Sequence, residues 1–344
     1  MTSLLSPGYS LTLGSQRWTE QLMRIELSLA AAPSLDALAV RLPAAAPLSA
    51  NVGDPAALTL NSGETEQAVF AGTIAAVQRR FDGIDVTALN AGGDLAQYRP
   101  AVTYEQVTAG SVVRYLCGDA GADVGEVADG VSLLYYVADP SRTALDHIAR
   151  VCGWSGAMAR VSAENRLETI VVDATQAEVA LKYGREIHAL ENRKLASPIR
   201  SFTVTGESGV GDTSSPDAFR PAVDFFAGNR PDGPNRQARW RSEPALRTSA
   251  AAATASAAHQ RAYTSRRERG RFTAFLQPGL RPGTIVEVQS LPDGLPSEPL
   301  LVYRVQHTFG PRGAVTRADF SKGGDSFDPS SLLGSLLGAV GGLL

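Results

Sequence analysis

Apolar and polar positions alternate along much of the first third of the chain, with the period of two that a half-buried β-strand requires. The alternation is strictest in residues 23–30 and recurs in residues 54–63, which end in a turn. Residues 67–91 form the clearest hairpin, because Asp82-Gly83 suits the positive φ angles of a type I′ turn. Many short strands with turn residues between them predict a β-barrel or a β-sandwich over residues 1–108.

Helical spacing replaces alternation after residue 108. Residues 111–121 predict a short helix that ends in glycines, and residues 139–156 predict a second helix. In the second helix Asp139 is the expected N-cap, Pro140 the first helical residue and Gly153 the stop. The apolar face of this helix is expected to comprise Ala144, Leu145, Ile148, Val151 and Cys152.

A hairpin-like pair of strands around Glu164-Asn165 follows the second helix, so residues 109–195 are predicted to form an α+β insert. Strand signals return at residues 199–206 and are followed by a polar loop rich in Gly, Pro and Asp. An Ala-rich stretch, residues 250–269, predicts a helix that ends at Gly270.

The best-defined segment, residues 281–320, predicts three strands with almost no reactive side chains. Val286 and Val288 share a face of the first strand. A run at period two along the second strand comprises Leu301, Tyr303, Val305, His307 and Phe309. Residues 196–328 are therefore predicted to return to strands, so the chain is strands, then a mixed insert, then strands again.

The last segment, residues 329–344, is an apolar Leu/Gly tail with helical spacing. Its predicted partner-binding residues are Leu332, Leu333, Leu336, Leu337 and Val340. A helix over residues 331–344 would reach about 21 Å, short of the roughly 30 Å of a bilayer core. Large apolar side chains in water favour aggregation, so a partner-binding peptide is preferred over an unstructured terminus.

The composition indicates real cores but no general affinity for nucleic acid. The chain has 344 residues, 44% of them hydrophobic, and a formal net charge of −3. The N-terminus lacks a basic region, and no apolar run reaches about 18 residues, so neither a signal peptide nor a membrane span is expected. Folding and assembly are expected in the cytoplasm.

Few residues offer chemistry. Cys117 and Cys152 are the only cysteines, and no Cys/His cluster has metal-ligand spacing, so no metal or cofactor is expected. Buried free thiols are the preferred state, with a single disulfide as the alternative. Of the four histidines, His147 is expected in solvent and His307 as a satisfied, partly buried side chain. No catalytic residue is therefore assigned.

Two glycine-rich stretches do not match catalytic or phosphate-binding motifs. Residues 206–211, GESGVG, lack the second glycine of a nucleophile elbow and predict a turn. Residues 118–125, GDAGADVG, match neither a phosphate loop nor a calcium loop and predict a connection.

Residues 229–272 carry the one strong charge asymmetry, ten arginines against three carboxylates. A solvated surface is one interpretation, and a docking face for an acidic partner is the other. The arginines proposed for partner binding are Arg266, Arg267, Arg269 and Arg271. Nucleic acid has little support as the partner, because few aromatic residues stand among these arginines for base stacking.

The order of these segments resembles a known family. Residues 281–289, 301–309 and 314–320 resemble the closing barrel of the bacteriophage late control protein D family, the baseplate hubs of contractile tails. Valine-glycine-repeat proteins of type VI secretion and the hubs of extracellular contractile injection systems are related to it. Residues 89–121, 139–170 and 181–191 match the family in the same order, so the resemblance covers roughly residues 5–325.

The resemblance implies two tandem tube-like β-barrels in one chain, the first over residues 1–108 and the second over residues 196–328, and three chains in a pseudo-sixfold ring. Such a homotrimer would join a hexameric inner tube, or its tube-initiator protein, to a trimeric spike, and would contact baseplate wedge or adaptor proteins. Some members continue into further domains. Because this sequence ends after the second barrel and the tail, we expect a separate spike protein, with the tail helping to hold it or the neighbouring protomers.

Two other functions stay open at this point. The first is an enzyme that cleaves peptidoglycan or polysaccharide, although no carboxylate pair stands out. The second is a nucleic-acid-binding protein that uses residues 229–272. The sequence also leaves open whether the particle is a phage tail, an injection system or a gene-transfer particle.

Overall fold

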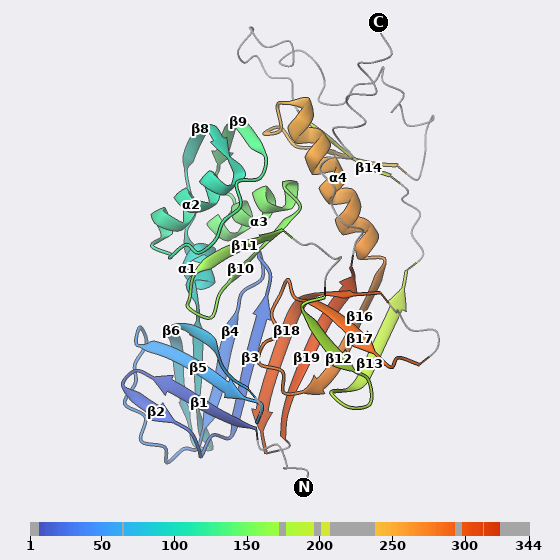
Figure 1. Ribbon diagram of the computed structural model, residues 1–344. Coiled ribbons are helices and arrows are strands. Elements are labelled where there is room, and N and C mark those ends of the chain that lie inside the picture. Colours follow the sequence, from blue (N-terminus) through green and yellow to red (C-terminus); the bar gives the residue numbers. More distant parts are fainter. Residues whose placement is uncertain are drawn as a thin grey trace, which may run out of the picture.

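Two lobes make up the chain, a large β-sheet and a mixed lobe of helices and strands (Figure 1). The computed structural model describes residues 7–63, 65–171, 177–195, 201–206, 238–292, 298–311 and 313–323. The predicted mainly β fold with an α+β insert is confirmed. Within the described ranges, no helix is long and apolar enough to cross a membrane.

The N-terminal part of the sheet, termed unit 1, shows the predicted alternation. In its third strand Ile25, Leu27 and Leu29 are buried, while Glu26 and Ser28 on the opposite face are only partly buried. The strands of unit 1 are β1 (Gly8–Leu13), β2 (Gln16–Trp18), β3 (Arg24–Ala30), β4 (Ala37–Leu42), β5 (Pro55–Asn61), β6 (Glu66–Arg80) and β7 (Gly83–Leu89).

The C-terminal part of the sheet, termed unit 2, includes the three strands predicted in residues 281–320. Val286 and Val288 are both buried, as expected for one face of a strand. The strands of unit 2 are β12 (Val179–Lys182), β13 (Ile187–Lys194), β16 (Glu268–Phe275), β17 (Ile285–Gln289), β18 (Leu300–Gly310) and β19 (Gly313–Lys322).

One strand pairing joins the two units. Residues 25–30 of β3 pair antiparallel with residues 304–309 of β18, so thirteen strands form one continuous sheet. Within unit 1 the strand order is β1-β5-β6-β7-β4-β3, and within unit 2 it is β12-β17-β18-β19-β16-β13. Among the described strands neither unit closes on itself, so each is an open sheet and not a closed barrel.

The two orders are the same arrangement. If the strands of each unit are numbered along the chain and β2 is left out, both sheets run first, fourth, fifth, sixth, third, second. Neighbouring strands are antiparallel in both units with one exception. The first strand of unit 2, β12, is parallel to β17, whereas β1 is antiparallel to β5.

Local details place the two units in register with each other. The fifth strand has a β-bulge in both, between Ile74 and Ala76 in β6 and between Val302 and Arg304 in β18. The same offset aligns residues 77–81, VQRRF, with residues 305–309, VQHTF, which share three of five residues. Identical residues at structurally equivalent positions indicate an internal duplication.

A glycine turn repeats in the same way. Gly53 and Gly283 have φ angles of 93° and 94°, in the region that favours glycine. Gly53 N donates to Ile74 O and Ile74 N to Asp54 O. In unit 2, Gly283 N donates to Val302 O, and Val302 N donates to Thr284 O. The backbone that enters the fourth strand is therefore held by the fifth strand in both units.

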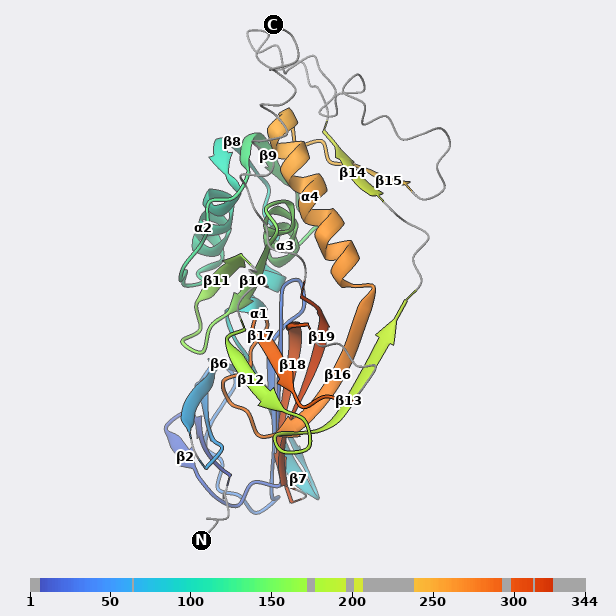
Figure 2. The ribbon, with the colours of Figure 1, turned by 45° about the vertical axis from the view of Figure 1, so that its right-hand side comes forward.

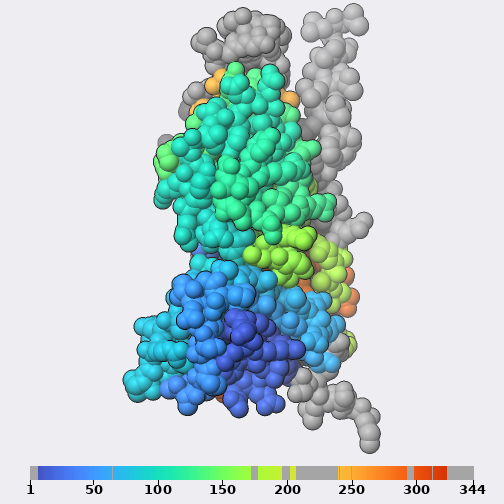
Figure 3. Space-filling model, turned by 90° about the vertical axis from the view of Figure 1, so that its left-hand side faces the viewer, coloured from blue at the N-terminus to red at the C-terminus, as the bar shows by residue number. Residues whose placement is uncertain are grey.

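The mixed lobe has a core of its own, formed around Leu116, Ile148, Trp154 and Leu167. It is coloured teal and green in Figure 3, where it is stacked on unit 1. Its elements are α1 (Ala91–Gln97), β8 (Val102–Thr108), α2 (Ala109–Ala120), β9 (Ser132–Ala138), α3 (Ala144–Trp154), β10 (Ala157–Val161), β11 (Leu167–Val171), β14 (Ser201–Thr205), β15 (Ala238–Ser242) and α4 (Ser249–Ser265).

Part of the segment assigned to the second barrel packs on this lobe instead. Val204 of β14, Leu246 in the segment before α4, and Ala252 of α4 are fully buried in the lobe core. Figure 2 shows α4 beside α3 and the other elements of the lobe. After α4 the chain runs directly into β16 of the sheet. Residues 207–235, predicted as a polar loop, and residues 329–344 lie outside the described residues.

The helix boundaries are partly as predicted. Helix α2 ends at Gly121, which has a φ of 73°, as the glycine signal indicates. The predicted caps of α3 are wrong. Thr143 is the N-cap and forms a capping box with Asp146, and Ser155 is the C-cap. Asp139 instead accepts a hydrogen bond from Ser141 N, which stabilises a turn before the helix.

Three further expectations need correction. Gly270 does not end α4, because the helix ends at Ser265 and Gly270 lies inside β16. The β6–β7 hairpin is confirmed, but its two turn residues are Phe81 and Asp82, neither with a positive φ. The predicted apolar run along β18 is interrupted, because the bulge at Tyr303 moves the buried positions from Val302 to Val305.

Gly270 gives a test of the sheet packing. A Cβ atom there would lie 2.0 Å from Glu191 O and 2.4 Å from the Phe320 ring. Gly270→Ala should therefore lower the free energy of unfolding by about 3 kcal/mol, measured by urea denaturation. As a matched control, Gly118→Ala in α2 meets nothing within 4 Å and should be neutral or stabilising by up to about 1 kcal/mol. Equal effects of the two substitutions would contradict this packing.

Candidate interaction surfaces

The sheet has an apolar face and a polar face, and the division runs through both units. Leu27 of unit 1 and Phe272 of unit 2 lie in the same buried core. Directly paired residues of neighbouring strands share a face, so the register identifies the opposite side of the sheet. Across β13, β16, β19 and β18, the paired residues Glu191, Arg271, Asp319 and Arg304 follow one another.

This polar face is rich in arginine. Across the eight strands from β13 to the part of β6 that pairs with β7, the register and the alternation assign to it eight arginines and four carboxylates, a surplus of four positive charges. The members are Arg24, Arg41, Arg80, Arg193, Arg269, Arg271, Arg304, Arg317, Glu26, Asp85, Glu191 and Asp319. Such a face suits contact with water or with anionic surfaces.

Ion pairs order part of the polar face. Arg271 Nε lies 2.6 Å from Asp319 Oδ1, and Arg80 Nε lies 3.2 Å from Asp85 Oδ2. These side chains are partly exposed, so each pair contributes only about 0–1 kcal/mol. Their effect is to fix where the charges lie.

The predicted partner-binding arginines lie where α4 meets the sheet. Arg266 is the C-cap of α4, and Arg267 follows it. Arg269 and Arg271 lie on β16, on the polar face, and both are exposed. The structure thus brings these four arginines together. The five predicted tail residues, Leu332 to Val340, lie outside the described residues.

Other arginines of residues 229–272 have internal partners. The Arg150 guanidinium contacts the buried carboxylate of Glu243 at 2.5 and 3.1 Å, and Arg241 Nε lies 2.6 Å from its other oxygen. The Arg247 guanidinium lies 5.0 Å from the ring centroid of Tyr135. Pairing with a buried carboxylate holds β15 and the start of α4 to α3, so part of this basic segment is structural.

The histidines are structural where the structure describes their contacts. His147 is buried and not in solvent, contrary to the expectation from helical spacing. Its Nδ1 lies 2.7 Å from the Tyr136 hydroxyl and its Nε2 lies 3.0 Å from Asp139 O. His307 is 2% exposed, and its Nδ1 lies 2.9 Å from Thr316 Oγ1, but its Nε2 is buried without a hydrogen-bond partner among the described residues. The histidine is therefore buried more fully than expected and satisfied at only one of its two ring nitrogens.

A buried carboxylate secures the junction between the sheet and the mixed lobe. Asp36 accepts hydrogen bonds from Ala30 N and from Asn90 Nδ2, both at 2.7 Å. Burial raises the pKa of Asp36 to about 6, and the two hydrogen bonds oppose that rise. Asn90 is also the N-cap of α1. The end of β3 and the start of the lobe are therefore fixed by one side chain.

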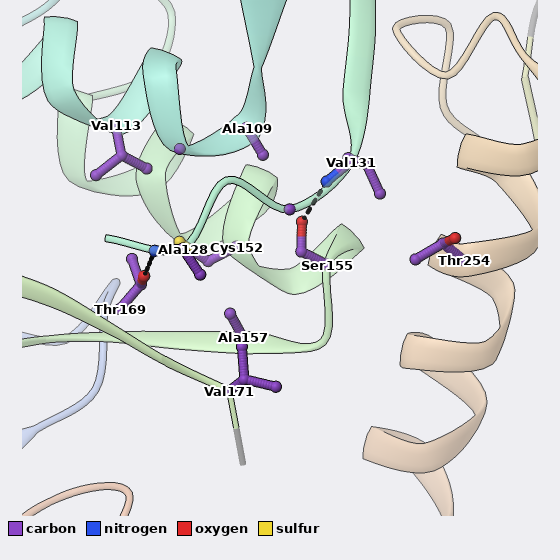
Figure 4. A pocket seen from close by; sticks show the side chains of 12 residues that line it. Ala109, Val113, Ala128, Val131, Cys152, Ser155, Ala157, Thr169, Val171 and Thr254 are labelled. Atoms are coloured by element: carbon purple, nitrogen blue, oxygen red, sulfur yellow. Dashed lines mark hydrogen bonds between the residues drawn. The ribbon is translucent and has the colours of Figure 1, made fainter. Parts of the chain in front are cut away.

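A cavity of about 280 Å³ lies in the mixed lobe between α2, β10, β11 and α4 (Figure 4). Small apolar side chains dominate its lining. The hydroxyls of Ser155 and Thr169 already accept hydrogen bonds from Val131 N and Ala128 N. Burial raises the pKa of the Cys152 thiol to about 12, so that thiol is not an activated nucleophile. The cavity therefore offers no group for acid–base or nucleophilic chemistry.

Both cysteines of the chain are free thiols. Cys117 and Cys152 are buried and unbridged, which confirms the expectation of buried free thiols. In the described ranges, no group of three or more His, Cys, Asp and Glu side chains could hold a metal ion.

The mixed lobe exposes an apolar strip on its outer side. In β9 the side chains of Leu134, Tyr135 and Val137 are exposed, and at the end of β11 so is Val171. Exposed apolar side chains that cluster on one strand, as they do on β9, mark a surface suited to a protein partner.

Comparison with solved structures shows the fold of phage tail proteins. The tail protein from Neisseria meningitidis MC58 has a TM-score of 0.69 and 13% identity, covering 92% of this chain and 96% of that one. The 43 kDa tail protein of prophage MuSo2 from Shewanella oneidensis has a TM-score of 0.65 and 14% identity, covering 92% and 98% of the two chains.

A type VI secretion component is similar as well. The E. coli c3393 protein, described as structurally similar to T4 bacteriophage tail proteins gp27 and gp5, has a TM-score of 0.59 and 11% identity, covering 93% of this chain and 77% of that one. No family model matches the sequence. No curated protein matches it either.

The resemblance implied two similar units in tandem, but the internal repeat was not identified from the residues themselves. Its signal is the repeated VQ-x-x-F of residues 77–81 and 305–309, together with the glycines at 53 and 283. Five residues with three identities are too short a match to identify a repeat alone. The shared bulge and shared hydrogen bonds make the match specific.

His307 gives a pH test of the sheet junction. Burial lowers its pKa from 6.5 to about 4, so the unfolded chain binds a proton that the folded chain excludes. The free energy of unfolding is therefore not reduced by this histidine above about pH 6.5. As the pH falls toward 4, protonation of His307 in the unfolded chain lowers the free energy of unfolding by on the order of 3 kcal/mol. Asp36, with a raised pKa, acts in the opposite direction between about pH 4 and 6.

Because Asp36 is common to both proteins, comparison with His307→Gln isolates the histidine. The difference in unfolding free energy between the wild type and this variant should shift in favour of the variant as the pH falls from 7 to 4.5, measured by urea denaturation at each pH. A difference that is constant with pH would contradict the buried, neutral state of His307.

Proposed function

We propose that this protein is the structural hub of a contractile tail or injection particle. Three copies form a ring that joins a hexameric inner tube, or its initiator protein, to a trimeric spike. The observation that carries this proposal is the duplicated six-stranded unit, two copies of which lie side by side in one sheet. Three chains then present six similar units, which allows a threefold assembly to match a sixfold partner.

The two faces of the sheet support this arrangement. In the ring, the polar face lines the central channel, since a water-filled channel tolerates the eight arginines and four carboxylates that it carries. The apolar face is already covered by the core of both units. The similarity in fold to phage tail and type VI secretion proteins supports the same reading.

The mixed lobe and the tail have separate proposed roles. The exposed apolar strip of β9 fits contact with a baseplate wedge or adaptor protein. The Leu/Gly tail, with Leu332, Leu333, Leu336, Leu337 and Val340, holds the spike or a neighbouring protomer. Deletion of residues 331–344 should release the spike from assembled particles without changing the folded core.

The ring is tested by mass and by imaging. The purified chain should have the mass of a trimer at high protein concentration, measured by light scattering. Negative-stain images should show a ring with six lobes around its channel. A chain that stays monomeric at every concentration, or forms an assembly without threefold symmetry, would contradict the hub. Assembly in the cytoplasm as part of such a particle is included in the proposal.

A further inference from the structure

Two strand edges of the continuous sheet have no partner among the described residues. At one end of the sheet, β13 pairs only with β16. Within unit 1, β5 pairs with β6 only as far as Thr73, so residues 75–80 of β6 pair with β7 alone. In Figure 1 these edges lie on opposite sides of the sheet. Unpaired edges readily accept another strand.

The duplication shows what belongs on these edges. Strand β6 of unit 1 is equivalent to β18 of unit 2, and β3 is equivalent to β13. Within the chain, the part of β18 that follows its bulge pairs with β3. The equivalent part of β6 and the equivalent strand β13 are the two unpaired edges. A second copy of this chain could therefore repeat between molecules the junction that already exists within one.

We propose that β13 of one copy pairs antiparallel with residues 76–81 of a second copy, and that three such junctions close the ring. This rests on the proposed hub and names the contact that forms it. Three junctions within chains, β3 with β18, then alternate with three between chains, β13 with β6. All six units are joined by the same type of strand pairing.

The register of the new junction follows from the internal one. In unit 1, Leu27 of β3 pairs with Leu38 of β4, and Leu38 pairs with Ala88 of β7. In unit 2, Asn192 of β13 pairs with Gly270 of β16, and Gly270 pairs with Phe320 of β19. Ala88 and Phe320 are each paired with the residue before the bulge. Asn192 is thus the equivalent of Leu27. The predicted partners are Val77 with Lys194, Gln78 with Arg193, Arg79 with Asn192, Arg80 with Glu191, and Phe81 with Leu190.

The chemistry of this register is favourable. Arg80 and Glu191 both lie on the polar face and would form a cross-strand ion pair. A slip of two residues would instead place Arg80 opposite Arg193, and like charges directly opposite are destabilising. The face parity of the two strands also agrees, since Val77 and Leu190 both pack against the apolar core.

Phe81 is an independent observation. Its side chain is 98% exposed, an unusual position for a phenylalanine in a monomer. Its equivalent in unit 2, Phe309, pairs with Ile25 and packs its ring 4.8 Å from that of Tyr9. In the proposed junction Phe81 is covered by Leu190 of the second copy, as Phe309 is covered within the chain.

Cysteine pairs test the contact and its register. Gln78→Cys with Arg193→Cys in one chain should give covalent trimers under mild oxidation, seen on non-reducing gels. The matched control is Ser28→Cys with Gln306→Cys, which occupies the paired positions of the internal junction and should close within the chain without a change in mass. The slipped pair, Gln78→Cys with Leu195→Cys, tests the register that places Arg80 opposite Arg193, and it should link far less.

The outcomes separate this inference from the hub itself. A trimer by mass whose Gln78→Cys, Arg193→Cys variant stays unlinked, while the internal control closes, overturns the β13–β6 contact and leaves the hub standing. A chain that stays monomeric contradicts both. Linking only in the slipped pair overturns the register and therefore the duplication argument.

Phe81→Ala should weaken trimer formation at least tenfold while leaving the unfolding midpoint of the monomer unchanged, because the ring is exposed in one copy. Phe309→Ala is the matched control, and it should lower the unfolding midpoint. Arg80→Glu and Glu191→Arg should each weaken the trimer severalfold, and the double variant should restore most of the loss. Unchanged association in Phe81→Ala, or no recovery in the double variant, counts against the contact.

Discussion

The pairing of β3 with β18 is the interaction on which the rest of the structure depends. It turns the seven strands of unit 1 and the six strands of unit 2, from opposite ends of the sequence, into one sheet with one core. Because antiparallel pairing fixes register, it also fixes which side chains of unit 1 share a face with those of unit 2. The continuous polar face, with its arginines and carboxylates, is a direct consequence.

The mixed lobe is attached to this sheet at defined points and does not interrupt it. Asp36 ties the end of β3 to the N-cap of α1, and α4 leads directly into β16. The buried Glu243, held between Arg150 and Arg241, secures the start of α4 to the lobe. Part of the charged segment 229–272, which the sequence offered as a docking surface, therefore stabilises the lobe through Arg241 and Glu243.

Alternation predicted the strands well, because β3 and the hairpin at residues 67–91 each bury one face. It could not predict which strands pair, since β3 and β18 lie almost 280 residues apart. It also failed where one residue shifts the pattern, as Tyr303 does in β18. Helix ends were missed where a capping box at Thr143 outweighed a nearby Asp-Pro pair. The candidate arginines lie at the junction of α4 and β16, and their role in partner binding stays a prediction.

The reversed direction of one strand has a consequence for symmetry. The two units share their strand order, yet β12 runs parallel to β17 whereas β1 runs antiparallel to β5. A closed assembly of three chains would therefore alternate two kinds of rim around its axis. A partner whose contacts depend on this difference would bind in three equivalent orientations, 120° apart. It would not bind in the three orientations rotated by 60° from these. The mismatch of one strand would set the rotational phase between the parts stacked above and below it.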